Sequence, residues 1–380
     1  TRIFKNGDTS KGWIARGLNM MNQFDRKSSQ IGSHGFNANI VRECVFDLKD
    51  ITFGTGTTQA WNPDSNSNVT LHGLRNLVND NRGSSSTTSD DKVTILVPFS
   101  YEDFDRVTGK NPYDMWYFTD GSYNNRLAAM ADAFKNDGDV WISTWNEPYG
   151  DDWTNTSWYH DQLSMIRAIR NTGNNNPIVV CGTLFANSMQ EFLDNGQYLL
   201  NAAPNTTDGR GKNIIFDWHA YKYMEWYDQA TIEARIQEVK DKNLCMIMGE
   251  YGPETGWWNG APIHINPTAV QNAVVNKKIG GLAWYLKPGN DGNCLVWDNW
   301  TAKNDVYNWY NTVKSFLNTM SNVVDSTGST PTNLVSNAGF EASAATQTPS
   351  GWTEQSWAGG VDAFYSESGG RSGSYRGTFW

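Results

Sequence analysis

The chain has 380 residues, which is enough for one large hydrophobic core and a small second module. Its formal net charge of −10 at pH 7 argues against nucleic acid and acidic polymers as partners. The sequence contains no stretch of about 18 apolar residues, so we expect no membrane-spanning helix.

The content of aromatic residues is high, with 18 Trp and 16 Tyr. Sugars present flat C–H faces that pack on indole and phenol rings, so this composition favours carbohydrate binding. An aromatic-rich core would give the same composition, and that alternative stays open. The four cysteines form neither a CxxC pair nor a Cys/His spacing typical of zinc, and spacing does not tell whether any two are bridged.

Eight short runs have the character of parallel strands, because they are apolar throughout instead of alternating with polar residues. In chain order they are WIARGLN (13–19), ANIVREC (38–44), VTILVPF (93–99), DVWISTWNE (139–147), NPIVVCGT (176–183), IIFDWHAY (214–221), LCMIMGEYG (244–252) and GGLAWYL (280–286).

Helical patterns follow most of these runs, with apolar residues three and four positions apart. The clearest patterns lie at 124–137, 157–173, 229–242, 266–278 and 305–320. Eight βα units in about 320 residues predict an α/β fold of the (β/α)8 TIM-barrel type. The alternative, an open doubly wound sheet, would usually have a Gly-rich phosphate turn after its first strand, and RGLNMMN (16–22) is not one.

The composition changes after the last helical pattern. Residues 321–333, SNVVDSTGSTPTN, read as a linker, and 334–380 contain short strand-like runs and turns without helical periodicity. A β-sandwich usually needs about 100 residues, so the last segment would be a truncated module. We therefore predict a barrel at 1–320, a linker at 321–333 and a partial β-rich module at 334–380. A tail that packs onto the barrel is the alternative.

Two carboxylic acids end predicted strands that are not neighbours. Glu147 lies in WISTWNEPYG (141–150) and Glu250 in GEYG (249–252). Active sites of TIM barrels lie at the carboxyl ends of the strands, so both side chains can face the same mouth. Cleavage of a glycosidic bond needs such a pair, one acid to protonate the leaving oxygen and one carboxylate to attack the anomeric carbon. Each glutamate taken alone could instead cap a helix or form a surface ion pair.

Other polar residues at strand ends could assist this pair. Arg42 could keep the nucleophile ionised, and His219 with Tyr221 could orient both acids. Asn146 could hold a substrate hydroxyl, and Trp284 offers a stacking surface. No His/Asp/Glu cluster has the spacing of metal ligands, so we expect no metal and no cofactor, and a metal-dependent hydrolase is disfavoured.

The motifs WNEP (145–148) and GEYG (249–252) resemble the acid/base and nucleophile motifs of family 5 glycoside hydrolases, which are retaining TIM barrels of clan A. The resemblance implies that Glu147 is the acid/base and Glu250 the nucleophile. It covers roughly residues 10–320, including RGLNM (16–20) in the first strand. The matching positions are Arg42 in NIVRE, Asn146 and Glu147 in NEP, His219 and Tyr221 in HAY, Glu250 in GEYG and Trp284 in LAWYL.

One position departs from the family pattern. The family usually has a His at the end of strand three, where this chain reads VPFSYED (97–103). We expect Tyr101 or Glu102 to take over its contact. Trp258 is a further substrate-binding candidate, and it belongs to a set of tryptophans expected in loops around a cleft with several subsites. The set is Trp61, Trp158, Trp226, Trp257 and Trp258.

HAYKY (219–223), IMGEYG (247–252) and GGLAWYL (280–286) resemble bacterial endo-β-1,4-mannanases most, although endoglucanases share part of them. We therefore expect a monomeric, secreted, retaining enzyme that hydrolyses mannan-type polysaccharides, its signal segment already removed. The alternatives are an endo-β-1,4-glucanase or another β-glycanase of the family, and a non-catalytic carbohydrate-binding protein. The segment from LVSNAGFE (334–341) onward resembles the beginning of a carbohydrate-binding β-sandwich module.

Overall fold

The structure is a computed structural model. It describes residues 3, 11–21, 29–45, 71–83, 92–101, 105–150, 157–209, 211–221, 224, 227–258, 261–326, 364–368 and 375–379. The chain divides into two compact units, one of residues 1–3 and 13–324 and the other of residues 4–12 and 325–380. None of the helices within the described ranges has the length and hydropathy of a membrane span.

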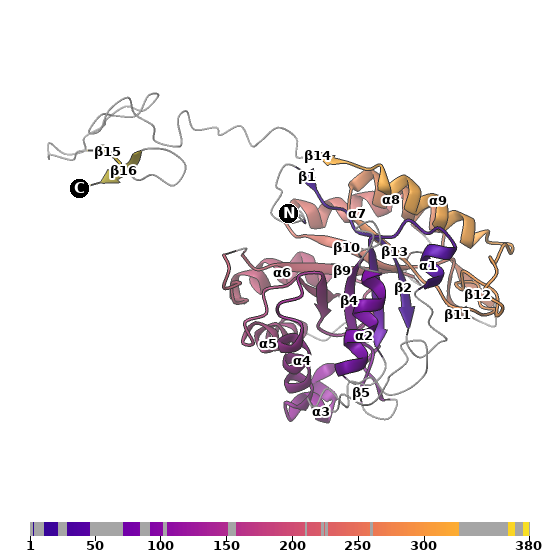
Figure 1. Ribbon diagram of the computed structural model, residues 1–380, viewed down its shortest axis with the longest axis horizontal. Coiled ribbons are helices and arrows are strands. Elements are labelled where there is room, and N and C mark those ends of the chain that lie inside the picture. Colours follow the sequence, from indigo (N-terminus) through magenta and orange to yellow (C-terminus); the bar gives the residue numbers. More distant parts are fainter. Residues whose placement is uncertain are drawn as a thin grey trace. The chain divides into compact units, whose positions relative to one another are not determined.

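The first unit is a closed barrel of eight parallel strands (Figure 1). Seven neighbouring pairs follow the chain order, and β13 closes the barrel by pairing Gly281 with Arg16 of β2. The structure confirms the predicted (β/α)8 fold. The strands are β2 (Arg16–Met21), β3 (Ile40–Val45), β4 (Val93–Pro98), β7 (Val140–Ser143), β8 (Ile178–Cys181), β9 (Ile214–Ala220), β10 (Met246–Tyr251) and β13 (Gly280–Ala283).

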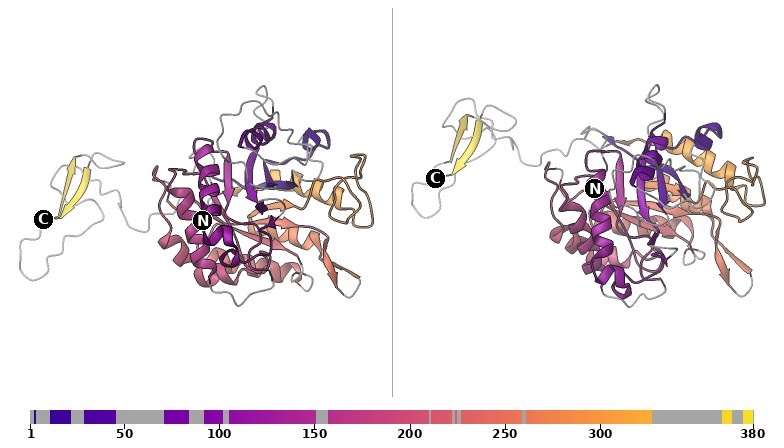
Figure 2. Two further views of the ribbon diagram at one scale, coloured as in Figure 1. Left: turned by 90° about the horizontal axis from the view of Figure 1, so that it is seen from below. Right: turned by 60° about the horizontal axis from the view of Figure 1, so that its bottom comes forward.

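Figure 1 and Figure 2 show the helices on the outside of the barrel strands. All five of the clearest helical patterns correspond to helices, and α2 and α6 add two more long ones. The α-helices of the described residues are α1 (Ser29–Ser33), α2 (Leu71–Arg82), α3 (Trp116–Thr119), α4 (Ser122–Ala133), α5 (Trp158–Arg170), α6 (Gln190–Ala202), α7 (Gln229–Asp241), α8 (Pro267–Lys277) and α9 (Trp309–Ser321). A short 3-10 turn, Pro112–Asp114, precedes α3.

Local sequence explains where α8 begins. Pro267 occupies the first turn, where its missing N–H costs no helical hydrogen bond. The side chain of Asn266 accepts hydrogen bonds from the backbone N–H groups of Thr268 and Ala269, at 3.1 and 3.2 Å. The helix ends at Lys277, before Lys278 turns into the left-handed region.

Buried side chains form two layers, one inside the barrel and one between strands and helices. The inner cluster includes Ile40, Cys44 and Ile215 and contains no helical residue, whereas Val41 and Val45 belong to the outer cluster. Side chains alternate along a strand, so Arg42 points into the barrel with Ile40 and Cys44. The four cysteines are buried and unbridged.

In the described part of the barrel unit, two antiparallel strand pairs follow barrel strands. Residues Ser100–Tyr101 (β5) pair with Asp105–Arg106 (β6) after β4, and Glu254–Trp258 (β11) pairs with Ala261–His264 (β12) after β10.

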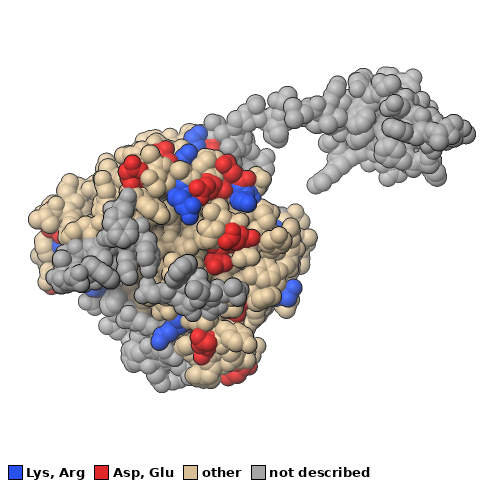
Figure 3. Space-filling view, turned by 180° about the vertical axis from the view of Figure 1, so that it is seen from behind, with Lys and Arg blue, Asp and Glu red and all other residues tan. Residues whose placement is uncertain are grey.

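On the face shown in Figure 3, the described acidic and basic side chains are interspersed. This face therefore offers no separate basic patch among its described residues.

The described residues of the second unit form two small antiparallel ladders. Lys11–Gly12 (β1) pairs with Asp325–Ser326 (β14), and Phe364–Ser368 (β15) pairs with Tyr375–Phe379 (β16). Most of residues 334–380 lie outside the described part of the chain. The predicted boundaries at 320 and 333, and the partial carbohydrate-binding-like module, stay predictions.

Candidate active site

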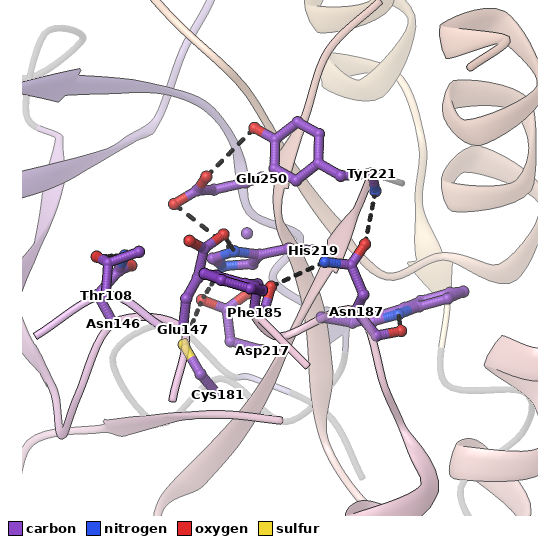
Figure 4. A network of polar contacts seen from close by, with 12 residues as sticks. Thr108, Asn146, Glu147, Cys181, Phe185, Asn187, Asp217, His219, Tyr221 and Glu250 are labelled. Atoms are coloured by element: carbon purple, nitrogen blue, oxygen red, sulfur yellow. Dashed lines mark hydrogen bonds and ion pairs between the residues drawn. The ribbon is translucent and has the colours of Figure 1, made fainter. Parts of the chain in front are cut away.

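The two candidate acids meet at the carboxyl ends of the strands (Figure 4). Glu250 lies in β10, and Glu147 follows β7 after Asn146. One carboxylate oxygen of each glutamate and a ring nitrogen of His219 all lie within 4.8 Å of one another. The Glu147 side chain is 12% exposed and that of Glu250 is 5% exposed. Both acids are therefore largely shielded from water, and Glu147 is the more accessible one.

The turn that presents Glu147 is held in an uncommon backbone conformation. Glu147 has a φ of 47° and Tyr149 a φ of 67°, both in the left-handed region that non-glycine residues rarely adopt. The loop after β6 fixes the turn, because the N–H of Gly109 donates to the Glu147 carbonyl at 2.7 Å. The N–H of Tyr149 likewise donates to the Lys110 carbonyl at 2.9 Å. Such strain persists only where neighbours impose it, and it often marks functional sites.

Arg42 links the nucleophile candidate to the residue beside the acid. It is fully buried, its Nη1 contacts Glu250 Oε1, and its Nη2 donates to Asn146 Oδ1 at 2.7 Å. The same Nη1 donates to Asn19 Oδ1 at 3.1 Å, and Asn19 donates to the Gly249 carbonyl at 2.8 Å. Contacts with three different side chains thus fix the orientation of the planar guanidinium.

The charge on Glu250 results from opposing effects. Burial raises the pKa of Glu250 to about 7, while His219 and Arg42 act to lower it. Tyr221 donates its hydroxyl to Glu250 Oε2 at 3.2 Å, and burial raises the pKa of Tyr221 well above its usual value. The phenol therefore stays a donor at neutral pH. The ionised form of Glu250 depends on these three neighbours.

His219 lies between the two glutamates. Its Nδ1 is 2.7 Å from Glu147 Oε1 and 3.7 Å from Glu250 Oε1, and its Nε2 is 3.4 Å from Asp217 Oδ2. Burial alone would lower the pKa of His219, but Glu250 and Asp217 raise it well above the usual value. The geometry thus favours an imidazolium that donates toward the carboxylates.

Three described residues of the site, Thr108, Asn187 and Asp217, were not among the sequence candidates. Thr108 Oγ1 accepts from Asn146 Nδ2 at 2.6 Å, and Asn187 Oδ1 accepts from the Tyr221 N–H at 3.1 Å. Asp217 lies two residues before His219 on the same strand, so the strand period alone could have placed both on one face. Thr108 and Asn187 lie in loops, whose positions the strand pattern does not indicate.

Of the remaining substrate-binding candidates, the structure describes the side chain of Trp284 only. Trp284 follows β13, its ring stacks on Tyr285 at 4.4 Å and 13°, and its backbone N–H donates to the Tyr251 carbonyl at 2.8 Å. Tyr101 lies in β5 and Trp258 in β11, and their side chains lie outside the described residues. Residues 61, 102 and 226 also lie outside the described part of the chain.

The expectation that Trp158 lines a cleft is wrong. It is the first residue of α5 and is fully buried, and its indole N–H donates to the Cys181 carbonyl at 2.9 Å. The ring packs near Phe192 of α6, with centroids 6.1 Å apart. This tryptophan is a core residue whose polar atom is already satisfied.

Among the described residues, two groups of side chains have ligand atoms close enough for a metal ion. They are Glu147, His219 and Glu250, and Cys181, Asp217 and His219. In each group the imidazole already contacts a carboxylate, that of Glu147 or of Asp217, and the guanidinium of Arg42 contacts Glu250 and Asp217. A bound cation would meet this fixed positive charge, so the donor set suits protons and a neutral substrate better than a metal.

Comparisons with known proteins agree with the barrel. A family model described as Cellulase (glycosyl hydrolase family 5) matches residues 86–303. The chain is also similar to a mannan endo-1,4-beta-mannosidase of Salipaludibacillus agaradhaerens, at 27% identity over 163 residues, 42% of this chain and 46% of that protein. The match thus spans about half the length of this curated relative.

Among solved structures, the chain is similar to a beta-mannanase from Thermomonospora fusca. The TM-score is 0.59 at 17% identity, with 83% of this chain and 93% of that one covered. A cellulase gives a TM-score of 0.57 at 15% identity, with 84% and 90% covered. These structures support the fold. Since the family model spans more than half of the 380 residues, the chain belongs to glycosyl hydrolase family 5.

Proposed function

We propose that this protein is a retaining, endo-acting glycoside hydrolase that cleaves β-1,4-mannosidic bonds in mannan-type polysaccharides. The observation that carries the proposal is the pair Glu147 and Glu250, whose nearest described oxygens lie within 4.8 Å with His219 between them. Retaining enzymes hold their two carboxyl groups about 5–5.5 Å apart, whereas inverting enzymes need about 6.5–9.5 Å for an intervening water.

The proposed reaction has two steps. In the first, Glu147 donates its proton to the glycosidic oxygen while Glu250 attacks the anomeric carbon, so the leaving sugar departs as an alcohol and a glycosyl ester forms. In the second, Glu147 takes a proton from water, whose oxygen attacks the same carbon and releases the Glu250 carboxylate. Two inversions leave the configuration retained.

The neighbours assist each step. Arg42 and Tyr221 contact opposite oxygens of Glu250, Oε1 and Oε2, and so aim the carboxylate and stabilise its ionised form. Arg42 also fixes Asn146, because its Nη2 holds Asn146 Oδ1 and leaves the amide beside the acid oriented. Asn146 is thus suited to hold a substrate hydroxyl during attack.

The choice of mannan rests on the relatives. The curated relative is a mannan endo-1,4-beta-mannosidase, and beta-mannanases occur among the similar structures. The second candidate is an endo-β-1,4-glucanase, which the cellulase description of the family model and the similar cellulase structure favour. Mannose and glucose differ only in configuration at C2, so one hydroxyl decides between the two.

The test is a panel of mannan, glucomannan, cellulose, xylan and galactan, with reducing ends and product sizes measured. Release of short oligomers from mannan and glucomannan, with little from cellulose, is the expected result. Preference for cellulose would move the assignment to the glucanase. No release from any of the five would contradict the hydrolase and favour a non-catalytic binding protein.

Glu43→Gln is the matched control for loss-of-activity variants. Glu43 neighbours Arg42 in β3 and is equally buried. Its side chain lies on the opposite face of the strand, in the outer layer, and accepts a hydrogen bond from Asn81 Nδ2 at 3.0 Å. We expect this variant to keep its activity.

Polysaccharides of this kind are met outside the cell, so we further propose an extracellular, monomeric enzyme, to be checked by cell fractionation and by light scattering.

A further inference from the structure

A third buried carboxylate lies beside the two glutamates. Asp217 belongs to β9 and is fully buried, and its side chain shares the inner face of the strand with His219. Its Oδ2 lies 3.4 Å from His219 Nε2, 3.4 Å from Arg42 Nε and 3.8 Å from the thiol of Cys181. Asp217 thus contacts both cations of the site, on the side away from Glu147.

The fold makes room for this carboxylate. A Cβ on Gly249 would lie 2.0 Å from Asp217 Oδ1, so the glycine directly before Glu250 lets the two strands approach with Asp217 between them. Oδ1 itself has no hydrogen-bond partner within the described structure. An ionised group that is buried and only partly satisfied costs free energy. Stability is therefore a poor explanation for its presence.

The charges around His219 show what Asp217 adds. Among the described residues, the titratable or charged groups that face, adjoin or interact with the imidazole are Glu147 after β7, Glu250 on β10, Asp217 on β9, Cys181 on β8, Arg42 and Cys44 on β3, and Tyr221 beyond β9. Three are carboxyl groups and one is a fixed cation. A neutral imidazole would leave the carboxylates in excess, and a charged one brings the site close to balance.

The protonation state of His219 decides whether its Nδ1 donates a hydrogen bond to Glu147 or accepts one from it. Asp217 accepts from Nε2–H, so a neutral ring would carry its only proton there and turn the lone pair of Nδ1 toward Glu147 Oε1, 2.7 Å away. This lone pair would compete with the glycosidic oxygen for the acid's proton. With both nitrogens protonated, Nδ1–H donates to Glu147 and leaves its proton for the substrate.

We propose that Asp217 is a positioning residue that keeps His219 doubly protonated, so that His219 donates to Glu147 instead of taking its proton. The inference rests on the proposed hydrolase function, in which Glu147 is the acid. The raised pKa of His219, to which Asp217 contributes, agrees with it. Asp217 acts through His219 and does not touch the substrate.

Asp217→Asn is the direct test, because an amide keeps the shape and an acceptor oxygen while it removes the charge. General acid catalysis contributes about 10²–10⁴-fold, and we expect kcat/KM on polysaccharide to fall by about 10²-fold. A dinitrophenyl glycoside of the same sugar has a leaving group that needs no proton. On this substrate the loss should stay within about threefold, because kcat/KM reports the first step only.

A second signature is the pH profile. Without the Asp217 charge the pKa of His219 falls, so activity on polysaccharide should be lost at a lower pH on the basic side. Glu43→Gln, a buried carboxylate on the outer layer, should change neither the profile nor the ratio of the two substrates. Equal losses on both substrates, or an unchanged basic limb in Asp217→Asn, would overturn the proposal and leave Asp217 a structural residue.

A direct readout covers the case in which Asp217→Asn does not fold. In wild-type protein with 15N-labelled histidine, the His219 ring nitrogens should show the shifts of an imidazolium at pH 7.5, assigned by comparison with His219→Gln. A neutral ring at that pH would contradict the proposal. If the wild type releases sugar from neither substrate, the proposed function fails instead, so the two failures are distinguishable.

Discussion

Two arginines of this barrel each bind two carboxylates, and their surroundings differ. Arg82 of α2 contacts Asp137 at 2.7 Å and Asp139 at 2.6 Å, and these three side chains are 20–36% exposed. Arg42 of β3 contacts Glu250 and Asp217, and all three side chains are 0–5% exposed. An arginine with two carboxylates thus forms a solvated cluster just before β7, near the amino end of that strand. A second such group forms a buried cluster toward the carboxyl ends of the strands.

The two clusters have different roles because they differ in burial. Water screens an exposed ion pair, so the Arg82 cluster contributes little and costs little. Burial of the Arg42 cluster removes hydration from every charge and makes each carboxylate sensitive to its neighbours. Only the buried cluster raises a carboxylate pKa to about 7, that of Glu250. Such a perturbation suits acid–base and nucleophilic chemistry.

The largest expected effect in the buried cluster comes from Glu250→Ala. It removes the proposed nucleophile, and loss of such a residue lowers kcat by about 10⁴-fold or more. Reducing-end release from mannan measures this loss, and circular dichroism checks the fold. Wild-type turnover by this variant would exclude Glu250 as the nucleophile, while Glu43→Gln serves as the active control.

Arg42→Gln should have the next largest effect and should change the pH dependence. Arg42 lowers the pKa of Glu250, so its removal raises that pKa above the value of about 7. Attack needs the ionised carboxylate, and the acidic limb of kcat/KM should therefore move to higher pH. Activity at pH 7 should fall by about 10²-fold or more, as for loss of a charge-stabilising donor. An acidic limb that stays in place would show that Arg42 does not set the charge of Glu250.

Tyr221→Phe should have a moderate effect. It deletes the hydroxyl that donates to Glu250 Oε2 at 3.2 Å, and a hydrogen bond to a charged group contributes about 1.5–3 kcal/mol. We expect kcat/KM to fall by about 10–100-fold, with Tm nearly unchanged. Tyr123→Phe, which deletes a buried hydroxyl that donates to the Thr144 carbonyl, is the control. Its activity should be kept, and a larger loss there than in Tyr221→Phe would contradict a specific role of Tyr221.

The smallest effect is expected for Arg82→Gln in the exposed cluster. The free energy of unfolding should fall by about 1 kcal/mol or less, and less in high salt, because the pairs are partly solvated. Activity and the acidic limb should match the wild type. Chemical denaturation at two salt concentrations measures the first, and the pH profile the second. A shifted limb would remove the contrast between the two clusters.

The sequence predicted the barrel because its strands are apolar runs at regular intervals, and it predicted Glu147 and Glu250 because strand ends converge in such a fold. The network beneath them was harder to foresee. Asp217 sits in an apolar run, where period two could have flagged it, whereas Thr108 and Asn187 depend on loop conformation. Trp158 was misplaced, since it opens α5 and its ring is buried against the barrel.

Helices α2 and α6 are not among the five clearest helical patterns of the sequence. Helix α6 carries Gly196 in its middle, a residue that weakens a helical pattern. The structure explains the glycine, because a Cβ there would lie 2.6 Å from Leu244 Cδ1. Close packing of the helix on the barrel selects it, and no local pattern in the sequence carries that information.

In the proposed mechanism, Glu250 forms a covalent bond to the sugar while Glu147 supplies the proton. Incubation with a 2-fluoro glycoside that has a dinitrophenyl leaving group, followed by peptide mass spectrometry, would detect this bond. The fluorine slows both steps, whereas the dinitrophenyl leaving group speeds only the first, so the glycosyl-enzyme should accumulate. We expect one sugar per chain, attached to Glu250. A label on another residue, or hydrolysis of polysaccharide with inverted configuration and no label, would contradict it.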